Sequence, residues 1–252
     1  MPVSPHPRFL PGVPADHVLD RLNKAGGNEA GSGKLDSPQS SAALAINAFG
    51  WFVERPGLLP PFPQLEAGWP PELVEVEYCA RFPWSGGRHP WLDAFVETGA
   101  CIIGVESKRF EPFRDTKTVS LSAAYDRPVW GNGMNPYERM RDLLRSGEVS
   151  FVHLDAAQLV KHAFGLVTEA TRRGKPAILL YLFAEPERLA GRVIDDAATR
   201  RHRTEIDLFA KLVAGAAVRF VACSYREWLG TWEASDLQVR GHGNAIAAAF
   251  RP

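Results

Sequence analysis

Apolar residues recur along this chain with two different periods, which predict both strands and helices. Five stretches have the pattern of strands, and the first three are close enough in sequence to pair as an antiparallel meander. Within the first of them, Val74, Val76 and Tyr78 are expected to share one face. The fourth is apolar throughout, as in a strand covered on both faces. The five predicted strands are 73–79, 91–97, 102–108, 177–183 and 218–223.

Helices are predicted before and between these strands. Ser37 is expected to cap a helix that has Pro38 in its first turn and ends by Gly57. The chain order is then helix, three strands, helix, strand, helix, strand, which predicts an α/β fold with a mixed central sheet flanked by helices. The later predicted helices are 135–145, 155–170 and 194–214, with a final helical segment at 225–232.

The second and third predicted strands are joined by a tight turn, and this turn sets their pairing. If Thr98–Gly99 is a two-residue hairpin turn, Asp93 lies opposite Gly104. Because side chains alternate between faces along a strand, Asp93 then shares a face with Glu106 and Lys108. A shift of one residue in the pairing would move Asp93 to the opposite face, so the prediction is open to refutation.

This pairing brings two carboxylates and an ammonium to one side of the sheet. Asp93 and Glu106 carry oxygen ligands of the kind that Mg²⁺ prefers, and Lys108 places a positive charge beside them. Gly104 leaves open space on the same face. The pattern predicts a metal site with a cationic partner, which is suited to phosphodiester chemistry.

Asp93 followed by Glu106-x-Lys108 on the next strand resembles the PD-(D/E)xK signature of the restriction-endonuclease-like nuclease superfamily. The stretches 40–50 and 157–162 also resemble a bacterial branch of this superfamily, and the likeness extends over roughly residues 35 to 230. The chain departs from the strict pattern at Pro90, which lies three residues before Asp93 and not directly before it.

The resemblance implies a restriction-endonuclease-like core and a role for each residue of the motif. Asp93 and Glu106 would bind Mg²⁺, with Mn²⁺ as a substitute, and the backbone carbonyl of Ser107 would add a further oxygen ligand. Lys108 would assist the attacking water by orienting it, lowering its pKa or stabilising the negative charge that develops. Taken alone, Glu106 and Lys108 fit an ordinary solvated strand face better than a site, and it is Asp93 together with the flanking likeness that favours the site.

Other residues are weaker candidates for the same site. Glu77 on the first strand could supply a third carboxylate, as could Glu75, which is expected on the same face. By resemblance, Gln158 on the helix after the motif points toward the site, where it could hold the metal ligands or a phosphate. His162 lies one helical turn later and is expected to pack or to support the site without acting as a catalyst.

Composition places limits on these interpretations. The chain has 252 residues, is 45% hydrophobic and carries 29 basic and 29 acidic residues, so its formal net charge is zero. This balance argues against a protein that coats duplex DNA, although the basic stretches 172–175 and 200–203 could form local patches. Three widely spaced cysteines form no zinc set and suit a reducing cytoplasm. The longest apolar run, 177–184, is too short to span a membrane, so no membrane partner is expected.

The chain is expected to comprise a Pro/Gly-rich N-terminal arm, residues 1–36, with a short helix at 15–24, followed by a single nuclease-like domain over residues 37–252. Three functions remain open. The leading one is a Mg²⁺-dependent nuclease that acts on DNA, and because many relatives cut both strands as dimers, a homodimer is also open. The second is a catalytically inactive nuclease fold that binds nucleic acid or a protein partner. The third is an unrelated α/β domain whose Glu-x-Lys is accidental.

Overall fold

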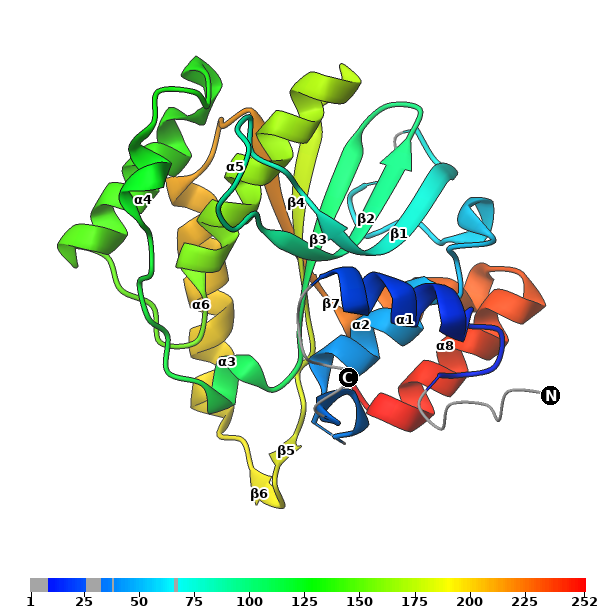
Figure 1. The fold of residues 1–252 in the computed structure, drawn as a ribbon. Helices are drawn as coiled ribbons and strands as arrows, with labels where there is room; N and C mark the ends of the chain where they lie inside the picture. The colour runs from blue at the N-terminus through cyan, green and yellow to red at the C-terminus, as the bar shows by residue number, and fades with distance from the viewer. Residues whose placement is uncertain (1–8, 26–32, 38, 66–67) are drawn as a thin grey trace.

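The fold is built on one five-stranded sheet with the strand order β1-β2-β3-β4-β7 (Figure 1). The computed structural model describes residues 9–25, 33–37, 39–65 and 68–252. Strands β1 to β3 pair antiparallel, whereas β3, β4 and β7 run parallel. This mixed sheet confirms the predicted α/β fold. The strands are β1 (Pro71–Cys79), β2 (Trp91–Thr98), β3 (Ile102–Lys108), β4 (Ala177–Phe183) and β7 (Val218–Ser224).

Helices cover both faces of the sheet and bury two apolar cores against it (Figure 1). One face carries α1 (Ala15–Lys24), α2 (Ser41–Gly50), α7 (Tyr225–Thr231) and α8 (Leu237–Phe250). The other carries α4 (Asn135–Ser146), α5 (Ala156–Arg173) and α6 (Asp196–Leu212). Short elements complete the fold: the helix α3 (Glu111–Arg114) and a projecting hairpin of β5 (Arg188–Leu189) and β6 (Arg192–Val193). No helix within the described residues is long and apolar enough to cross a membrane.

The central strand and its covering helix follow directly from the sequence. All seven residues of β4 are buried, as expected for an apolar run between two helical layers. Helix α5 begins where Asp155 accepts a hydrogen bond from the Gln158 backbone N–H at 2.9 Å. It ends at Gly174, whose φ of +64° suits glycine at a helix C-terminus.

Helix α2 begins later than the sequence predicts. Ser40, not Ser37, is the cap: its side chain accepts a hydrogen bond from the Ala43 N–H at 3.1 Å. Ser37 instead accepts from the Ser40 N–H through its backbone carbonyl at 2.9 Å, which forms a turn before the helix. The helix then ends at Gly50, so the predicted span of 37–57 is too long at both ends.

Strand β1 changes face at Glu77, which corrects the predicted position of Tyr78. Val74 and Val76 pack in the α2-side core, as predicted. Tyr78 stacks on Phe95 on the opposite face, with ring centroids 4.1 Å apart. Glu77 has a φ of +48°, a left-handed conformation that interrupts the alternation of a strand.

The hairpin between β2 and β3 turns one residue later than predicted. The Thr98 N–H donates to the Cys101 carbonyl at 2.9 Å, which places Gly99 and Ala100 at the tip. The Thr98 hydroxyl stabilises this turn by accepting from the Ala100 and Cys101 N–H groups at 3.1 and 3.0 Å. Gly104 therefore pairs with Phe95, and the predicted pairing of Gly104 with Asp93 is wrong.

The first and last helices of the chain both lie on the α2 side of the sheet. Helix α1 forms where the sequence predicts it and buries Val18 and Leu22. The rest of the predicted arm lies partly outside the described residues, which omit 1–8 and 26–32. Helix α8 was not predicted, because its segment contains Gly241 and Gly243 and little amphipathic spacing.

Candidate active site

A cleft of about 610 Å³ opens at the carboxyl end of β3, beside the first residues of β2. Its charged lining includes Glu77, Asp93, Lys108 and Glu111, and residues 39–42 at the start of α2 line it as well. We refer to it as the active-site cleft. The first, second and third strands each supply one of these charged groups, so the antiparallel meander is what assembles them.

Asp93 lies at a point where β2 also leaves regular alternation. Leu92 is buried in the α5-side core and Ala94 in the α2-side core, so Asp93 stands at the change of face. Its carboxylate accepts a hydrogen bond of 2.6 Å from the Ser107 N–H, just beyond the Ala94–Val105 pair of the ladder. Burial, and next the negative charge of Glu106, raise the pKa of Asp93 well above its usual range.

Glu106 has the opposite electrostatic balance. It is only 1% exposed and faces α5, where His162 Nδ1 lies 3.1 Å from its Oε2. Its Oε1 forms an ion pair with the Lys108 ammonium. Burial favours the neutral acid, but Lys108 and His162 outweigh it and lower the pKa of Glu106 to about 2.

Lys108 remains a cation in this setting. Burial alone would lower its pKa, yet the carboxylates of Glu106, Asp93 and Glu111 raise it above the usual value. The side chain is 16% exposed and lines the active-site cleft. Asp93, Glu106 and Lys108 are thus electrostatically linked, with Asp93 and Lys108 open to the cleft and Glu106 beneath them.

Of the weaker candidates predicted from the sequence, some lie at the active-site cleft and others lie away from it. Glu77 lines the active-site cleft, and its charge contributes to the raised pKa of Asp93. Glu75 instead contacts α1, with its Oε2 3.5 Å from both His17 Nε2 and Arg21 Nε. Gln158 is half-buried at the start of α5, and it is His162, one turn later, that reaches Glu106.

Two features of the site escaped the sequence reasoning. Glu111 follows β3 and accepts hydrogen bonds from the Ser41 hydroxyl and, at 3.0 Å, from the Arg109 N–H. It thereby joins the end of β3 to the start of α2. The Ser107 hydroxyl lies 2.7 Å from the Tyr225 hydroxyl on the face opposite Glu106. Glu111 could have been predicted, because an acid shortly after the motif strand lies near the site. The Ser107–Tyr225 contact could not, because it joins residues 118 positions apart.

A family model described as a restriction endonuclease associating with ARP matches residues 8–244. The chain belongs to this family. No curated protein and no solved structure matches at a significant level. Membership of the restriction endonuclease family, together with the mixed sheet, confirms the superfamily resemblance noted from Asp93, Glu106 and Lys108.

Whether the carboxylates of the active-site cleft fit a metal ion depends on how many of them lie close together. Within the described residues, no group of three or more His, Cys, Asp and Glu side chains is placed to hold one. Mg²⁺ needs fewer protein ligands, because it keeps several waters and is usually bound by one or two carboxylates. The mutual repulsion of Asp93 and Glu106 is what a divalent cation would relieve. The donors present therefore fit Mg²⁺ or Mn²⁺.

Proposed function

We propose that this protein is a metal-dependent nuclease that hydrolyses phosphodiester bonds in DNA at the active-site cleft. The observation that carries the proposal is the convergence of Asp93, Glu106 and Lys108, buried and electrostatically linked, in a chain of the restriction endonuclease family. Each of the three groups that the chemistry requires is intact, which favours an active enzyme over a degenerate member of the fold.

Asp93, Glu106 and the Ser107 carbonyl would hold the metal. In a β-strand, the N–H and C=O of one residue point to the same side, and the Ser107 N–H points to Asp93. The Ser107 carbonyl is therefore directed to the same edge of β3. A bound Mg²⁺ or Mn²⁺ would activate a water nucleophile and compensate the charge of the phosphate. Glu77 stands nearby as a further carboxylate.

Lys108 supplies charge and not base catalysis. Because its pKa is raised, it carries a proton throughout the neutral range and cannot accept one from water. Its ammonium, partly open to the cleft, is suited to orient the attacking water and to stabilise charge on the phosphate. Gln158 would contribute only indirectly, whereas His162 orients the Glu106 carboxylate.

DNA is the substrate that best agrees with the restriction endonuclease family. A cytoplasmic location and a homodimer that cuts both strands remain predictions from the sequence. The alternative, an inactive fold that binds nucleic acid or a protein, draws on the Lys108–Glu106 ion pair, which occupies one carboxylate oxygen. A metal titration separates the two functions.

The test is calorimetric titration of Mn²⁺ and Mg²⁺ into wild type, Asp93→Asn and Glu106→Gln. Glu75→Gln is the matched control, because it likewise removes a strand carboxylate, but one on β1 that contacts α1 and does not line the cleft. We expect binding in wild type and the control, and at least tenfold weaker binding in the two site variants. Equal heats in all four proteins would refute the metal site.

Cleavage of linear and supercoiled DNA is then measured in Mg²⁺, with EDTA as the blank. Lys108→Met should retain metal binding but lose at least a hundredfold in cleavage rate, since it removes the cation and leaves the carboxylates of Asp93 and Glu106 in place. Wild type that binds metal yet leaves every DNA substrate intact would favour the binding function.

A further inference from the structure

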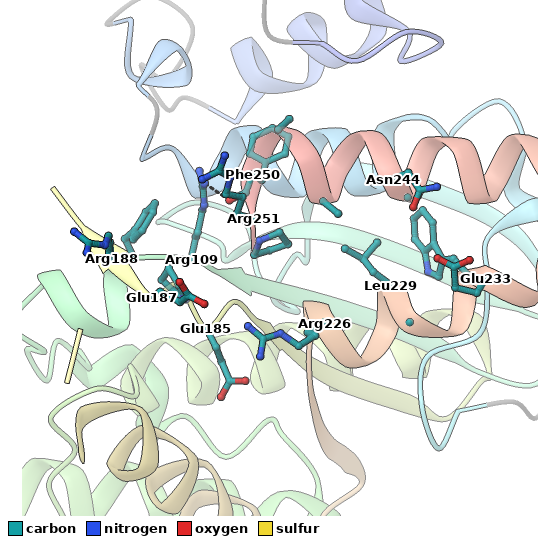
Figure 2. A pocket seen from close by; sticks show the side chains of 18 of the residues that line it. Arg109, Glu185, Glu187, Arg188, Arg226, Leu229, Glu233, Asn244, Phe250 and Arg251 are labelled. Atoms are coloured by element: carbon teal, nitrogen blue, oxygen red, sulfur yellow. Dashed lines mark hydrogen bonds between the residues drawn. The ribbon is translucent and has the colours of Figure 1, made fainter. Parts of the chain in front are cut away.

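A second cavity of about 640 Å³ lies across β3 from the active-site cleft, between α7, α8 and the segment that follows β4 (Figure 2). We call it the α7–α8 pocket. Arg109, Glu185 and Arg226 line it, and each follows closely after the end of β3, β4 or β7. Crevices outside the carboxyl ends of parallel strands are common ligand sites, and the volume is within the usual range for one.

The pocket lining carries five arginines against the three carboxylates of Glu185, Glu187 and Glu233. Within the described residues, the side chains of Arg226, Arg240 and Arg251 make no hydrogen bond or ion pair with protein groups. Glu185, by contrast, is already bound by Arg203 through two contacts of 2.6 and 2.8 Å. Arginine donors are arranged as a fork that matches phosphate and carboxylate oxygens, so the pocket favours an anion.

A buried donor points to the same conclusion independently. Trp232 lines the pocket and is 1% exposed, yet its indole Nε1–H has no hydrogen-bond partner. The ring is fixed by edge-to-face packing on Phe52 and Trp228 and by close contact with Gly243, where a Cβ would approach it to 2.8 Å. Leaving such a donor unsatisfied is costly, and an acceptor on a bound molecule would remove the cost.

The two ends of the pocket differ in chemistry. Figure 2 shows Asn244 and Glu233 near each other at one end, and Phe250 with Arg109 at the other. Leu229 lies between these ends as an apolar surface. A molecule that fits would be anionic at one end, flat and partly apolar in the middle, and bordered by donors and acceptors.

We propose that the α7–α8 pocket binds a nucleotide, with its phosphate on the arginines and its base against the apolar surface, read by Trp232, Asn244 and Glu233. The proposal does not depend on DNA cleavage at the active-site cleft. The nucleotide could be free in solution or extruded from a nucleic acid strand, and both sources present the same phosphate, sugar and base.

The test is tryptophan fluorescence and calorimetry on the full chain in EDTA, so that no metal-dependent binding contributes. The probes are AMP, GMP, guanosine, inorganic phosphate and a single-stranded oligonucleotide. A nucleotide should bind at least tenfold more tightly than guanosine or phosphate, because only the nucleotide fills both ends of the pocket. Binding of AMP or GMP identifies a free nucleotide, whereas binding of the oligonucleotide alone identifies an extruded one.

Three variants make the test specific to the pocket. Arg226→Ala, at an exposed position, and Trp232→Phe, which keeps a ring but removes the N–H, should each weaken binding about tenfold. Arg200→Ala removes an exposed arginine on α6 outside the pocket and should bind as wild type does. No binding of any nucleotide or oligonucleotide, phosphate binding as tight as nucleotide binding, or unchanged affinity in Arg226→Ala would overturn the proposal.

Discussion

Asp93 is half-buried and Glu106 is buried, and the protein compensates the charges of these two carboxylates very differently. Glu106 has Lys108 and His162 beside it, and its pKa falls to about 2. Asp93 has a single N–H donor from Ser107 and the repulsion of Glu106, so its pKa is raised. The electrostatic cost of bringing the two carboxylates together therefore falls on Asp93.

This difference predicts opposite effects of two neutralising substitutions on stability. Asp93→Asn removes the repulsion while keeping an acceptor for Ser107, so in EDTA at pH 7 the free energy of unfolding should stay level or rise by about 1 kcal/mol. Glu106→Gln leaves Lys108 without its carboxylate and should cost about 3 kcal/mol. Urea denaturation measures both, and equal losses in the two variants would contradict this account.

A second residue-scale prediction concerns His202, which is fully buried with its Nε2 2.9 Å from the Tyr181 hydroxyl. Burial, assisted by nearby His153, lowers the pKa of His202 from 6.5 to about 4. The unfolded chain therefore takes up a proton at a higher pH than the folded protein does. Stability is complete above about pH 6.5 and is lost as the pH falls toward about 4.

The expected loss from this residue is up to roughly 3 kcal/mol over that pH window. His202→Phe should flatten the pH dependence of the unfolding free energy between pH 6.5 and pH 4.5, as measured by urea denaturation at several pH values. A variant whose curve runs parallel to that of wild type would show that His202 is protonated equally in both states.

At the scale of elements, the sequence predicts strands with a regular pattern of buried residues, but it does not predict the points where a strand changes face or a turn is displaced. Strand β4 has the predicted bounds, because a run of seven buried residues leaves no alternative. The changes of face at Glu77 and Asp93 were not predicted, because neither residue is a glycine, the residue type that indicates an irregular backbone. The hairpin tip was displaced by the hydrogen bonds of the Thr98 hydroxyl.

The arrangement of the candidate site was likewise predictable only where it follows from regular strand geometry. Glu106 and Lys108 lie two residues apart on β3, so their convergence follows from strand geometry. Asp93 joins them at the point where β2 changes face, and it accepts the Ser107 N–H there, which the assumed turn did not foresee. The contact of Glu106 with His162 depends on how closely α5 approaches the sheet, a distance that no pattern in the chain reveals.

Gly104 sets that approach and gives an element-scale prediction. A Cβ at Gly104 would lie 2.7 Å from both Cδ atoms of Leu166 on α5 and 2.8 Å from Leu92 Cδ1. Gly104→Ala should therefore lower the free energy of unfolding by about 1–3 kcal/mol and weaken metal binding, since α5 carries His162. Gly99→Ala is the control, because a Cβ there meets only Glu72 Oε1 at 3.5 Å. Thermal melts and Mn²⁺ titrations should separate the two alanines.

At the scale of the whole molecule, two cavities share the carboxyl edge of the sheet on opposite sides of β3. Ser107 and Tyr225 join them, because Ser107 lines the active-site cleft and Tyr225 begins the helix that lines the α7–α8 pocket. Both cavities thus open at one edge of the sheet, while the opposite edge carries the β2–β3 hairpin tip.

Asn47 connects distant parts of the chain and supports a whole-molecule prediction. Its side chain accepts from the Leu10 N–H at 2.7 Å and donates to the Ala43 carbonyl at 2.8 Å. Asn47→Ala should lower the free energy of unfolding by about 1–3 kcal/mol and speed the hydrogen exchange of the Leu10 amide. Unchanged exchange at Leu10 would show that packing alone holds this segment.

The backbone carbonyl of Asn47 also lies 2.8 Å from His242 Nε2, a contact between residues 195 positions apart. His242 stacks on Trp51, so the apolar side of α2 is completed by α8. A ribosome releases α2 long before α8, and until then Trp51 and Phe52 lack their ring contacts with His242. The packing around the C-terminal end of α2 is therefore completed only when the last helix of the chain has been synthesised.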